Sequence, residues 1–349
     1  GFVGMRKFRL IFADDKSPVY FRCFSFFVGK NKRFVSKIQT PILLRVFCQF
    51  RLFVRLLRLE PRCVEMIDRE TLVFCLLHKV WVLNLETGEM KILFEASDGF
   101  SNPLNFCKVG NSVYWGDYGN NAERKEVGVY HVDSSLKVKC VYKFPHNSIR
   151  HVHNIVFDGE SRQFWIMTGD NDKKAGIYRA DSDFLRVEPI NIGEQRYRAV
   201  VAFPYKDGII YATDSVEDEN HLYVCESDND YVVRQLTPIN GSCIYGTETK
   251  DYYVFSTTVE PPEGRGIRAL FSNKLGGGIK SRDVHLVTVA KRDLSDIRIV
   301  AKYRKDWLPM KLFQYGAVMF PSGQYRNEDL LIFPVACKGV DGESIRITL

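Results

Sequence analysis

Runs of aromatic and aliphatic residues along this chain stop repeatedly at an acidic residue. Three of these runs end at Asp117, Asp170 and Asp214, and a looser fourth run ends at Glu260. The four acids are 53, 44 and 46 residues apart. Repeats of about 40 to 50 residues that hold several short strands and no long helix are typical of propeller blades. The pattern therefore predicts an all-β fold, built as a single β-propeller.

Within each repeat, the alternation of apolar and polar residues predicts four short strands joined by tight turns. In the clearest repeat, the third, strands are expected at 151–157, 163–168, 176–180 and 185–190. We expect six blades within residues 62–349, and a seventh if residues 8–28 add strands that close the ring. Closure is expected because an open ring would leave sheet edges unpaired.

Residues 1–61 follow a different pattern and are predicted to form a basic segment, packed on the propeller or tethered to it. Between residues 41 and 59, large apolar side chains share one arc of a helical projection and arginines share the opposite arc. Pro41 suits the first turn of such a helix and Pro61 marks its end. Two interpretations stay open: a helix packed on the propeller with its arginines in solvent, or a helix making peripheral contact with an anionic membrane.

The positive charge of the chain is concentrated at this end. The formal net charge is +7, and residues 1–60 contribute thirteen Lys and Arg against three acids, a net of +10, which leaves −3 for the rest. A uniformly basic face is therefore not expected, and stacking motifs on a basic strand platform are missing. The sequence predicts no nucleic-acid partner.

Nine cysteines are scattered without a C-x-x-C pair or zinc-type spacing, so reduced structural cysteines are expected. No secretory signal is evident near the start, and no run reaches 18 uninterrupted apolar residues. We expect a cytoplasmic location, peripheral at the inner membrane if the helix at 41–59 binds lipid.

Charged residues are expected to gather at one mouth of the propeller channel. The loop before the first strand of a blade and the loop after its second strand emerge on the same face, and the four acids all follow predicted second strands. We predict that this mouth binds an acidic oligosaccharide or polysaccharide. The predicted substrate-binding residues are Arg150, Arg198, Arg124, Tyr118, Asn121, Tyr197, Gln195, Asp214 and Glu260.

The predicted catalytic residues are two histidines and two acids. His151 and His153 are two positions apart on one strand, so their side chains are expected on the same side. One imidazole could serve as a general base beside Asp170 or Asp117, or the pair could hold a divalent metal. The structural alternative is that both imidazoles bond backbone and carboxylate groups between blades.

The stretches 115–124 (Trp-Gly-Asp-Tyr-Gly-Asn-Asn-Ala-Glu-Arg), 150–158 (Arg-His-Val-His-Asn-Ile-Val-Phe-Asp) and 168–172 (Thr-Gly-Asp-Asn-Asp) resemble the sialidase-like BNR-repeat propeller proteins found beside bacterial capsule and exopolysaccharide genes. The resemblance covers roughly residues 60–260. The Ser-x-Asp-x-Gly-x-Thr-Trp turn of such proteins has decayed here to sequences such as Ala180-Asp181-Ser182-Asp183-Phe184. The resemblance implies a propeller fold and a glycan context, without neuraminidase activity.

These observations lead to one functional expectation and one alternative. The first is a carbohydrate-binding or carbohydrate-active propeller in bacterial surface polysaccharide metabolism, lyase-like or hydrolase-like if it is catalytic. The alternative is a propeller without catalytic activity that serves as a scaffold for a membrane-associated polysaccharide assembly complex.

Overall fold

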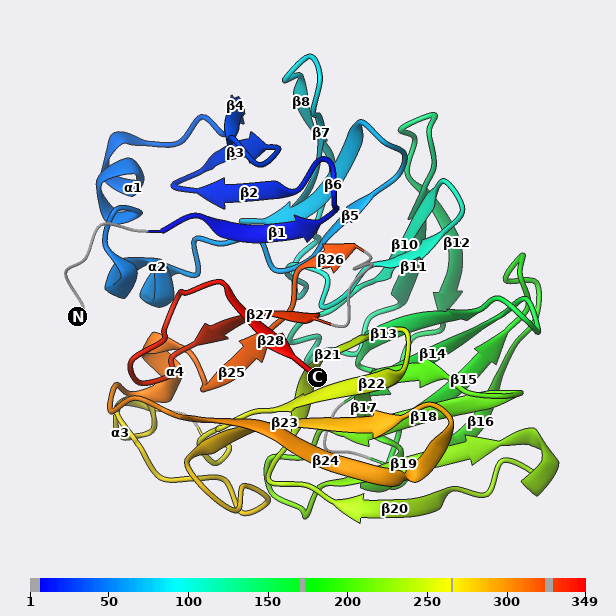
Figure 1. Ribbon diagram of the computed structural model, residues 1–349. Coiled ribbons are helices and arrows are strands. Elements are labelled where there is room, and N and C mark those ends of the chain that lie inside the picture. The colour runs from blue at the N-terminus through cyan, green and yellow to red at the C-terminus, as the bar shows by residue number, and fades with distance from the viewer. Residues whose placement is uncertain (1–6, 170–172, 265, 324–328) are drawn as a thin grey trace. The chain divides into compact units, whose positions relative to one another are not determined.

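The computed structural model describes residues 7–169, 173–264, 266–323 and 329–349 (Figure 1). These residues form seven sheets and four short α-helices. The chain divides into two compact units. The first comprises Gly1–Glu60, Ser215–Asn220 and Pro238–Leu349, and the second comprises Pro61–Asp214 and His221–Thr237.

The second unit contains four sheets, each made of four strands that follow one another along the chain. The strands are β5 (Val64–Met66), β6 (Thr71–Leu76), β7 (Lys79–Asn84), β8 (Met90–Glu95), β9 (Cys107–Val109), β10 (Ser112–Gly116), β11 (Val127–Val132), β12 (Lys139–Phe144), β13 (His151–Asp158), β14 (Gln163–Gly169), β15 (Gly176–Ala180), β16 (Val187–Ile192), β17 (Ala199–Pro204), β18 (Gly208–Thr213), β19 (His221–Glu226) and β20 (Arg234–Pro238). All of the pairings given for these strands are antiparallel.

Neighbouring sheets of the second unit pack face to face. Trp115 and Val73 share one apolar cluster between the first two sheets, and Phe164 joins residues of the next pair. Trp165 and Tyr211 belong to the cluster that follows. The second strands supply much of this core, and β14 and β18 are buried almost throughout. Successive four-stranded sheets stacked in this way are propeller blades.

The first unit holds the remaining three sheets and all four helices. Its strands are β1 (Arg9–Ala13), β2 (Val19–Arg22), β3 (Ser25–Val28), β4 (Arg33–Lys37), β21 (Cys243–Glu248), β22 (Tyr252–Thr257), β23 (Asp283–Ala290), β24 (Asp293–Arg304), β25 (Ala317–Met319), β26 (Ser322–Gly323), β27 (Asp329–Val335) and β28 (Ile345–Thr348). The helices are α1 (Ile42–Phe47), α2 (Arg51–Leu57), α3 (Ile267–Leu270) and α4 (Met310–Phe313).

The favoured count of six blades is wrong, because the structure has seven, and the alternative in which residues 8–28 add strands is confirmed. Residues 9–37 form a sheet of their own, in which β1 to β4 follow one another. Strand β26, from the last part of the chain, pairs with β1 in parallel, with Phe12 opposite Ser322, and so ties this part of the chain to its beginning. Residues 1–61 are therefore not a helical segment apart from the propeller, since half of them belong to a blade.

The helix predicted at 41–59 is also different in the structure. It is broken into α1 and α2 by residues 48–50, and Arg58 ends α2 in a left-handed conformation. Of the arginines expected in solvent, Arg58 is exposed, but Arg51 and Arg55 are turned inward: Arg55 is 0% exposed, and its Nη1 lies 2.5 Å from Asp306 Oδ2. Arg51 donates to Asp341 through two nitrogens, at 2.9 and 3.2 Å. Within the described residues, no helix is long and apolar enough to cross a membrane.

Candidate functional site

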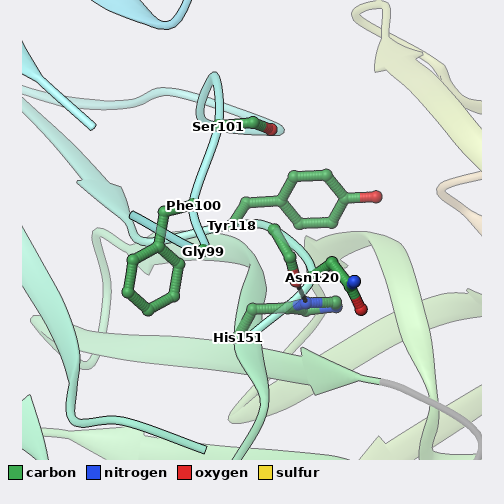
Figure 2. Close-up of a pocket in the computed structure, with 7 residues that line it drawn as sticks. Gly99, Phe100, Ser101, Tyr118, Asn120 and His151 are labelled. Carbon is green, nitrogen blue, oxygen red and sulfur yellow. Dashed lines mark hydrogen bonds between the residues drawn. The ribbon is translucent and has the colours of Figure 1, made fainter. Parts of the chain in front are cut away.

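A pocket of about 540 Å³ lies in the second unit, where three loops of neighbouring blades meet (Figure 2). Residues 99–101 come from the loop before β9, residues 118–120 follow β10, and His151 begins β13. The expectation that loops before first strands and loops after second strands gather on one face is thus confirmed at this pocket. Its lining residues are Gly99, Phe100, Ser101, Tyr118, Gly119, Asn120 and His151.

His151 is held in a defined orientation at the floor of this pocket. Its Nδ1 lies 2.6 Å from the carbonyl oxygen of Gly119, and the residue is 3% exposed. A carbonyl oxygen can only accept, so Nδ1 carries the proton, and in the neutral tautomer the lone pair lies on Nε2, which is buried in this structure. The backbone of Gly119 therefore selects the tautomer in which His151 can act as a base at Nε2.

Three rings lie together beside the pocket. The Tyr118 ring centroid is 4.7 Å from that of His151 and 6.1 Å from that of His153, and the two imidazoles are 4.9 Å apart. The expected proximity of the two histidines is confirmed. His153 Nδ1 lies 2.9 Å from the Ala199 carbonyl of the next blade, which is the interblade contact of the structural alternative.

The loops that form the pocket are anchored at several points. The Phe100 ring packs against the core between the sheet of β9–β12 and the sheet of β13–β16. In Figure 2 it points away from Tyr118, Asn120 and His151. Ser101 N–H donates to the Tyr118 carbonyl at 2.8 Å, which joins two of the loops. Asn121 is 2% exposed and donates to the carbonyls of Lys125 and Arg150. Asn121 therefore shapes the loop from beneath, and the neighbouring Asn120 faces the pocket.

A pair of thiols supports the far end of the first loop. Cys63, just before β5, and Cys75 in β6 have their Sγ atoms 3.0 Å apart, and each Sγ lies within hydrogen-bonding reach of the Pro103 carbonyl, at 3.6 and 3.8 Å. The nine cysteines are thiols in the structure, in agreement with the reduced cysteines that the sequence predicts.

Two guanidinium groups flank the pocket and favour anions. Arg150 Nη2 donates to Asn120 Oδ1 at 2.7 Å, and Arg62 lies over the Tyr118 ring, with its Cζ 5.2 Å from the centroid. Arginine binds carboxylate groups in a bidentate manner that lysine cannot match. The predicted role of Arg150 is consistent with this position, and Arg62 is a residue that sequence reasoning missed.

Asp117 follows β10 as predicted, but its carboxylate turns into its own blade. Oδ2 accepts hydrogen bonds from Gly128 N at 2.8 Å and from the Tyr130 hydroxyl at 3.1 Å. Burial raises the pKa of Asp117 to about 6, although both donors favour the ionised form. Its backbone carbonyl accepts from Val152 N at 2.9 Å, so Asp117 fixes the start of β13 through its main chain. Pairing of this carboxylate with a catalytic histidine stays a prediction.

The other predicted site residues of the second unit lie outside the pocket lining. Arg198 and Asp214 form a buried ion pair, with Nη2 and Oδ2 3.5 Å apart. The Tyr197 hydroxyl reaches Glu194 at 3.4 Å, and Gln195 begins the same short 3₁₀ turn. Arg124 lies in the loop after β10 and has a positive φ of 50°. Its backbone carbonyl accepts a hydrogen bond from the Asn147 N–H. The structure does not bring these five residues together with His151 at one pocket.

The two remaining predicted acids are Glu260 and Asp170. Glu260 belongs to the first unit and is buried there, where it accepts hydrogen bonds from the hydroxyls of Ser242 and Thr258. Asp170 lies outside the described residues.

The histidine pair alone does not complete a metal centre. No three His, Cys, Asp or Glu side chains within the described ranges gather closely enough to hold a metal ion. Each imidazole is held through Nδ1 by a carbonyl, as metal-binding histidines often are. However, a Cβ added at Gly169 would fall 2.1 Å from His153 Nε2, so that nitrogen lies against the backbone of β14. The described residues do not fit a metal site, and the divalent metal stays a prediction.

Gly99, Phe100 and Ser101 were also missed by sequence reasoning. They belong to a loop with no periodic pattern and no terminal acid. The blade prediction alone could have located them, because this loop precedes the first strand of a blade.

Comparison with known proteins supports the fold. No family model matches the chain, and no curated protein matches its sequence. An oligogalacturonate lyase in complex with manganese has a TM-score of 0.53 at 8% identity, over 87% of this chain and 79% of that chain. An oligogalacturonate lyase from Vibrio parahaemolyticus has a TM-score of 0.53 at 7% identity, over 91% of this chain and 87% of that chain. The WD40 propeller domain of Doa1 has a TM-score of 0.53 at 13% identity, over 96% of this chain and 93% of that chain. At such identities the likeness shows the fold alone: the chain has a β-propeller fold.

Proposed function

We propose that the pocket beside His151 binds an acidic oligosaccharide and cleaves it by β-elimination. The observation that carries this proposal is the combination, around one hollow, of an oriented imidazole, an exposed amide, an aromatic ring and two flanking guanidinium groups. A role in bacterial surface polysaccharide metabolism, and a location in the cytoplasm, come from the resemblance and the sequence and belong to the same proposal.

Each group has a part in recognition. The Tyr118 ring offers an apolar face against which a sugar ring can stack, and the Asn120 amide can exchange hydrogen bonds with sugar hydroxyls. Arg150 and Arg62 neutralise a uronate carboxylate. The cationic surroundings thus favour a uronic acid over a neutral sugar.

The elimination uses the lone pair of His151 Nε2, a buried atom that has to become exposed when the oligosaccharide enters the pocket. With the carboxylate neutralised by arginine, the proton on the carbon next to it becomes more acidic, and Nε2 removes it. The electron pair left behind forms a double bond to the adjacent ring carbon, and the bond from that carbon to the glycosidic oxygen breaks. The leaving oxygen takes a proton from water, and the imidazolium returns its proton to solvent. The products are an unsaturated uronate and a shortened chain, with no net consumption of water.

Two of the solved structures that resemble this chain are oligogalacturonate lyases, and this supports a uronate as the substrate to be tried first. One of them was solved with manganese. Because the described residues of this chain do not fit a metal site, no step of the proposed reaction is assigned to a metal.

The proposal is tested with galacturonate oligomers and with neutral glucose oligomers of equal length. Formation of the unsaturated product is followed by its ultraviolet absorbance, and binding is measured by calorimetry. We expect the wild-type protein to bind and cleave only the acidic oligomers. Replacing His151 with Ala should lower turnover at least about 100-fold, because a general base contributes roughly 100- to 10,000-fold.

His146→Ala is the matched control, because His146 is an exposed histidine outside the pocket. It should leave turnover unchanged. Binding of the acidic oligomer without any unsaturated product would reject catalysis and favour the scaffold alternative. Absence of binding to acidic oligomers would reject the proposal as a whole.

A further inference from the structure

The helices of the first unit expose large apolar side chains on one surface. In α1, Ile42 is 77% exposed, Leu43 62% and Val46 51%. This is the reverse of an ordinary surface helix, in which the apolar side faces the core. In α2, Arg51 and Arg55 are held inward by carboxylates, and Leu57 on the other side of the helix is 39% exposed.

The same surface continues over α4 and α3. Contacts join α2 to α4 and α4 to α3, and the three helices lie along one side of the unit (Figure 1). Arg58 donates to the Lys311 carbonyl, and the Lys311 ammonium donates to the Gly264 carbonyl. Trp307, at 70% exposed, is joined to the loop after α3 through Asn273. We call this surface the helical apolar face, made of Ile42, Leu43, Val46, Phe50, Leu57, Ile267, Leu270, Phe271 and Trp307.

The segments that carry this face are strongly cationic. Residues 41–59 contain four arginines and no acid, and residues 261–282 contain three arginines and two lysines against Glu263. Arg58, Arg268 and Lys274 are exposed. The face therefore combines aliphatic and aromatic side chains with a rim of positive charge.

We propose that the helical apolar face docks the protein on an anionic phospholipid bilayer. Leu, Ile, Phe and Trp beside Lys and Arg is the composition of helices that lie in the membrane interface, where apolar side chains enter the acyl boundary and cations meet the headgroups. A second copy of the chain fits this surface less well, because a symmetric contact would bring two cationic rims together. The sequence predicted lipid contact for residues 41–59, and the structure extends the surface to α3 and Trp307.

Vesicle co-sedimentation tests this proposal with the whole chain. The probes are vesicles of phosphatidylcholine alone and vesicles of phosphatidylcholine mixed with phosphatidylglycerol. We expect binding to the anionic vesicles that is at least about tenfold tighter than to the neutral ones and that weakens with salt, because cations near an anionic surface add to affinity. The double variant Ile42→Ser/Leu43→Ser and the pair Phe271→Ser/Trp307→Ser should each weaken binding on the order of tenfold or more, through lost apolar burial.

The matched control is Leu185→Ser/Val232→Ser, which removes two exposed apolar side chains of the second unit and should leave binding unchanged. Since all six residues are exposed, each variant is expected to fold, and circular dichroism checks this. Equal loss of binding in the control and in the face variants would overturn the proposal. So would absence of vesicle binding by the wild-type protein, including the case in which light scattering shows self-association that the face variants abolish.

Discussion

The polar cluster around Arg55 in the first unit and the pocket around His151 in the second unit both bury ionisable side chains, but the second also borders a hollow. Arg55 is enclosed, with Nη1 on Asp306 and Asp341 and Nε 2.8 Å from the Phe313 carbonyl. His151 is equally buried, yet it lines a hollow of about 540 Å³. Burial alone therefore does not identify a functional residue. What distinguishes the two is whether the residue is enclosed by protein on every side, as Arg55 is, or lines a hollow, as His151 does.

The two regions also differ in the direction in which the pKa of a buried carboxylate is shifted. Burial by itself would raise the pKa of Asp306, but hydrogen bonds and charges from Arg55 and Lys305 lower it. Asp117 has only a backbone amide and a phenol as partners, and burial raises its pKa to about 6. The cationic partners make the difference.

The largest expected effect is at Arg55. Replacing Arg55 with Ala leaves buried carboxylates without their cation, and removing one partner of a buried ion pair costs about 3–5 kcal/mol of unfolding free energy. Chemical denaturation measures the loss. Arg268→Ala, at an exposed arginine of α3, is the control and should cost about 0.5 kcal/mol or less. Equal effects of the two substitutions would show that the cluster does not stabilise the first unit.

Gly169 tests whether His153 is fixed by packing. A Cβ at this position would lie 2.1 Å from His153 Nε2, so Gly169→Ala must displace the imidazole and should cost about 1–3 kcal/mol. In the double variant with His153→Ala, the two costs should not add, because the clash is removed. If the two free-energy costs add in full, the His153 ring does not rest on Gly169. His153 would then again be a candidate metal ligand or base.

Asp117 gives the contrast in pH dependence. Its folded-state pKa lies above the ordinary value of 3.8, so the folded protein holds more protons than the unfolded chain between those values. Stability should therefore rise as the pH falls through about 6, and be lost as the pH rises through it. Between about pH 8 and pH 5 we expect a gain of roughly 1–2 kcal/mol in the wild-type protein relative to Asp117→Asn. No difference between the two proteins in this window would mean that Asp117 ionises without penalty.

The blade strands were largely predictable, because each buries a short, continuous apolar run. The strand expected at 163–168 is β14, and the one expected at 176–180 is β15. The sheet at residues 9–37 was not predicted in full, since its basic residues obscure the blade pattern. The inward orientation of Arg55 on α2 could not be predicted, because its partner Asp306 is 251 positions away in the sequence. Such partners leave no local signal.

The candidate site was predictable only in part. Blade connectivity correctly brings Tyr118 and His151 together. It says nothing of side-chain direction, so it could not reveal that the Asp117 carboxylate turns toward Gly128 and Tyr130. Nor could it reveal that Arg198 is occupied by Asp214.

The smallest expected effect is at Arg150, and it tests whether the pocket prefers anions. Arg150 contacts Asn120 at 2.7 Å and is partly exposed, so its attraction to a bound carboxylate is screened by solvent. Arg150→Ala should weaken binding of a galacturonate oligomer about five- to tenfold and leave the unfolding free energy within about 0.5 kcal/mol of the wild type. Calorimetry with a neutral oligomer of equal length is the control. If both ligands lose the same affinity, Arg150 acts only by positioning Asn120; a loss confined to the acidic ligand means that its charge selects the substrate.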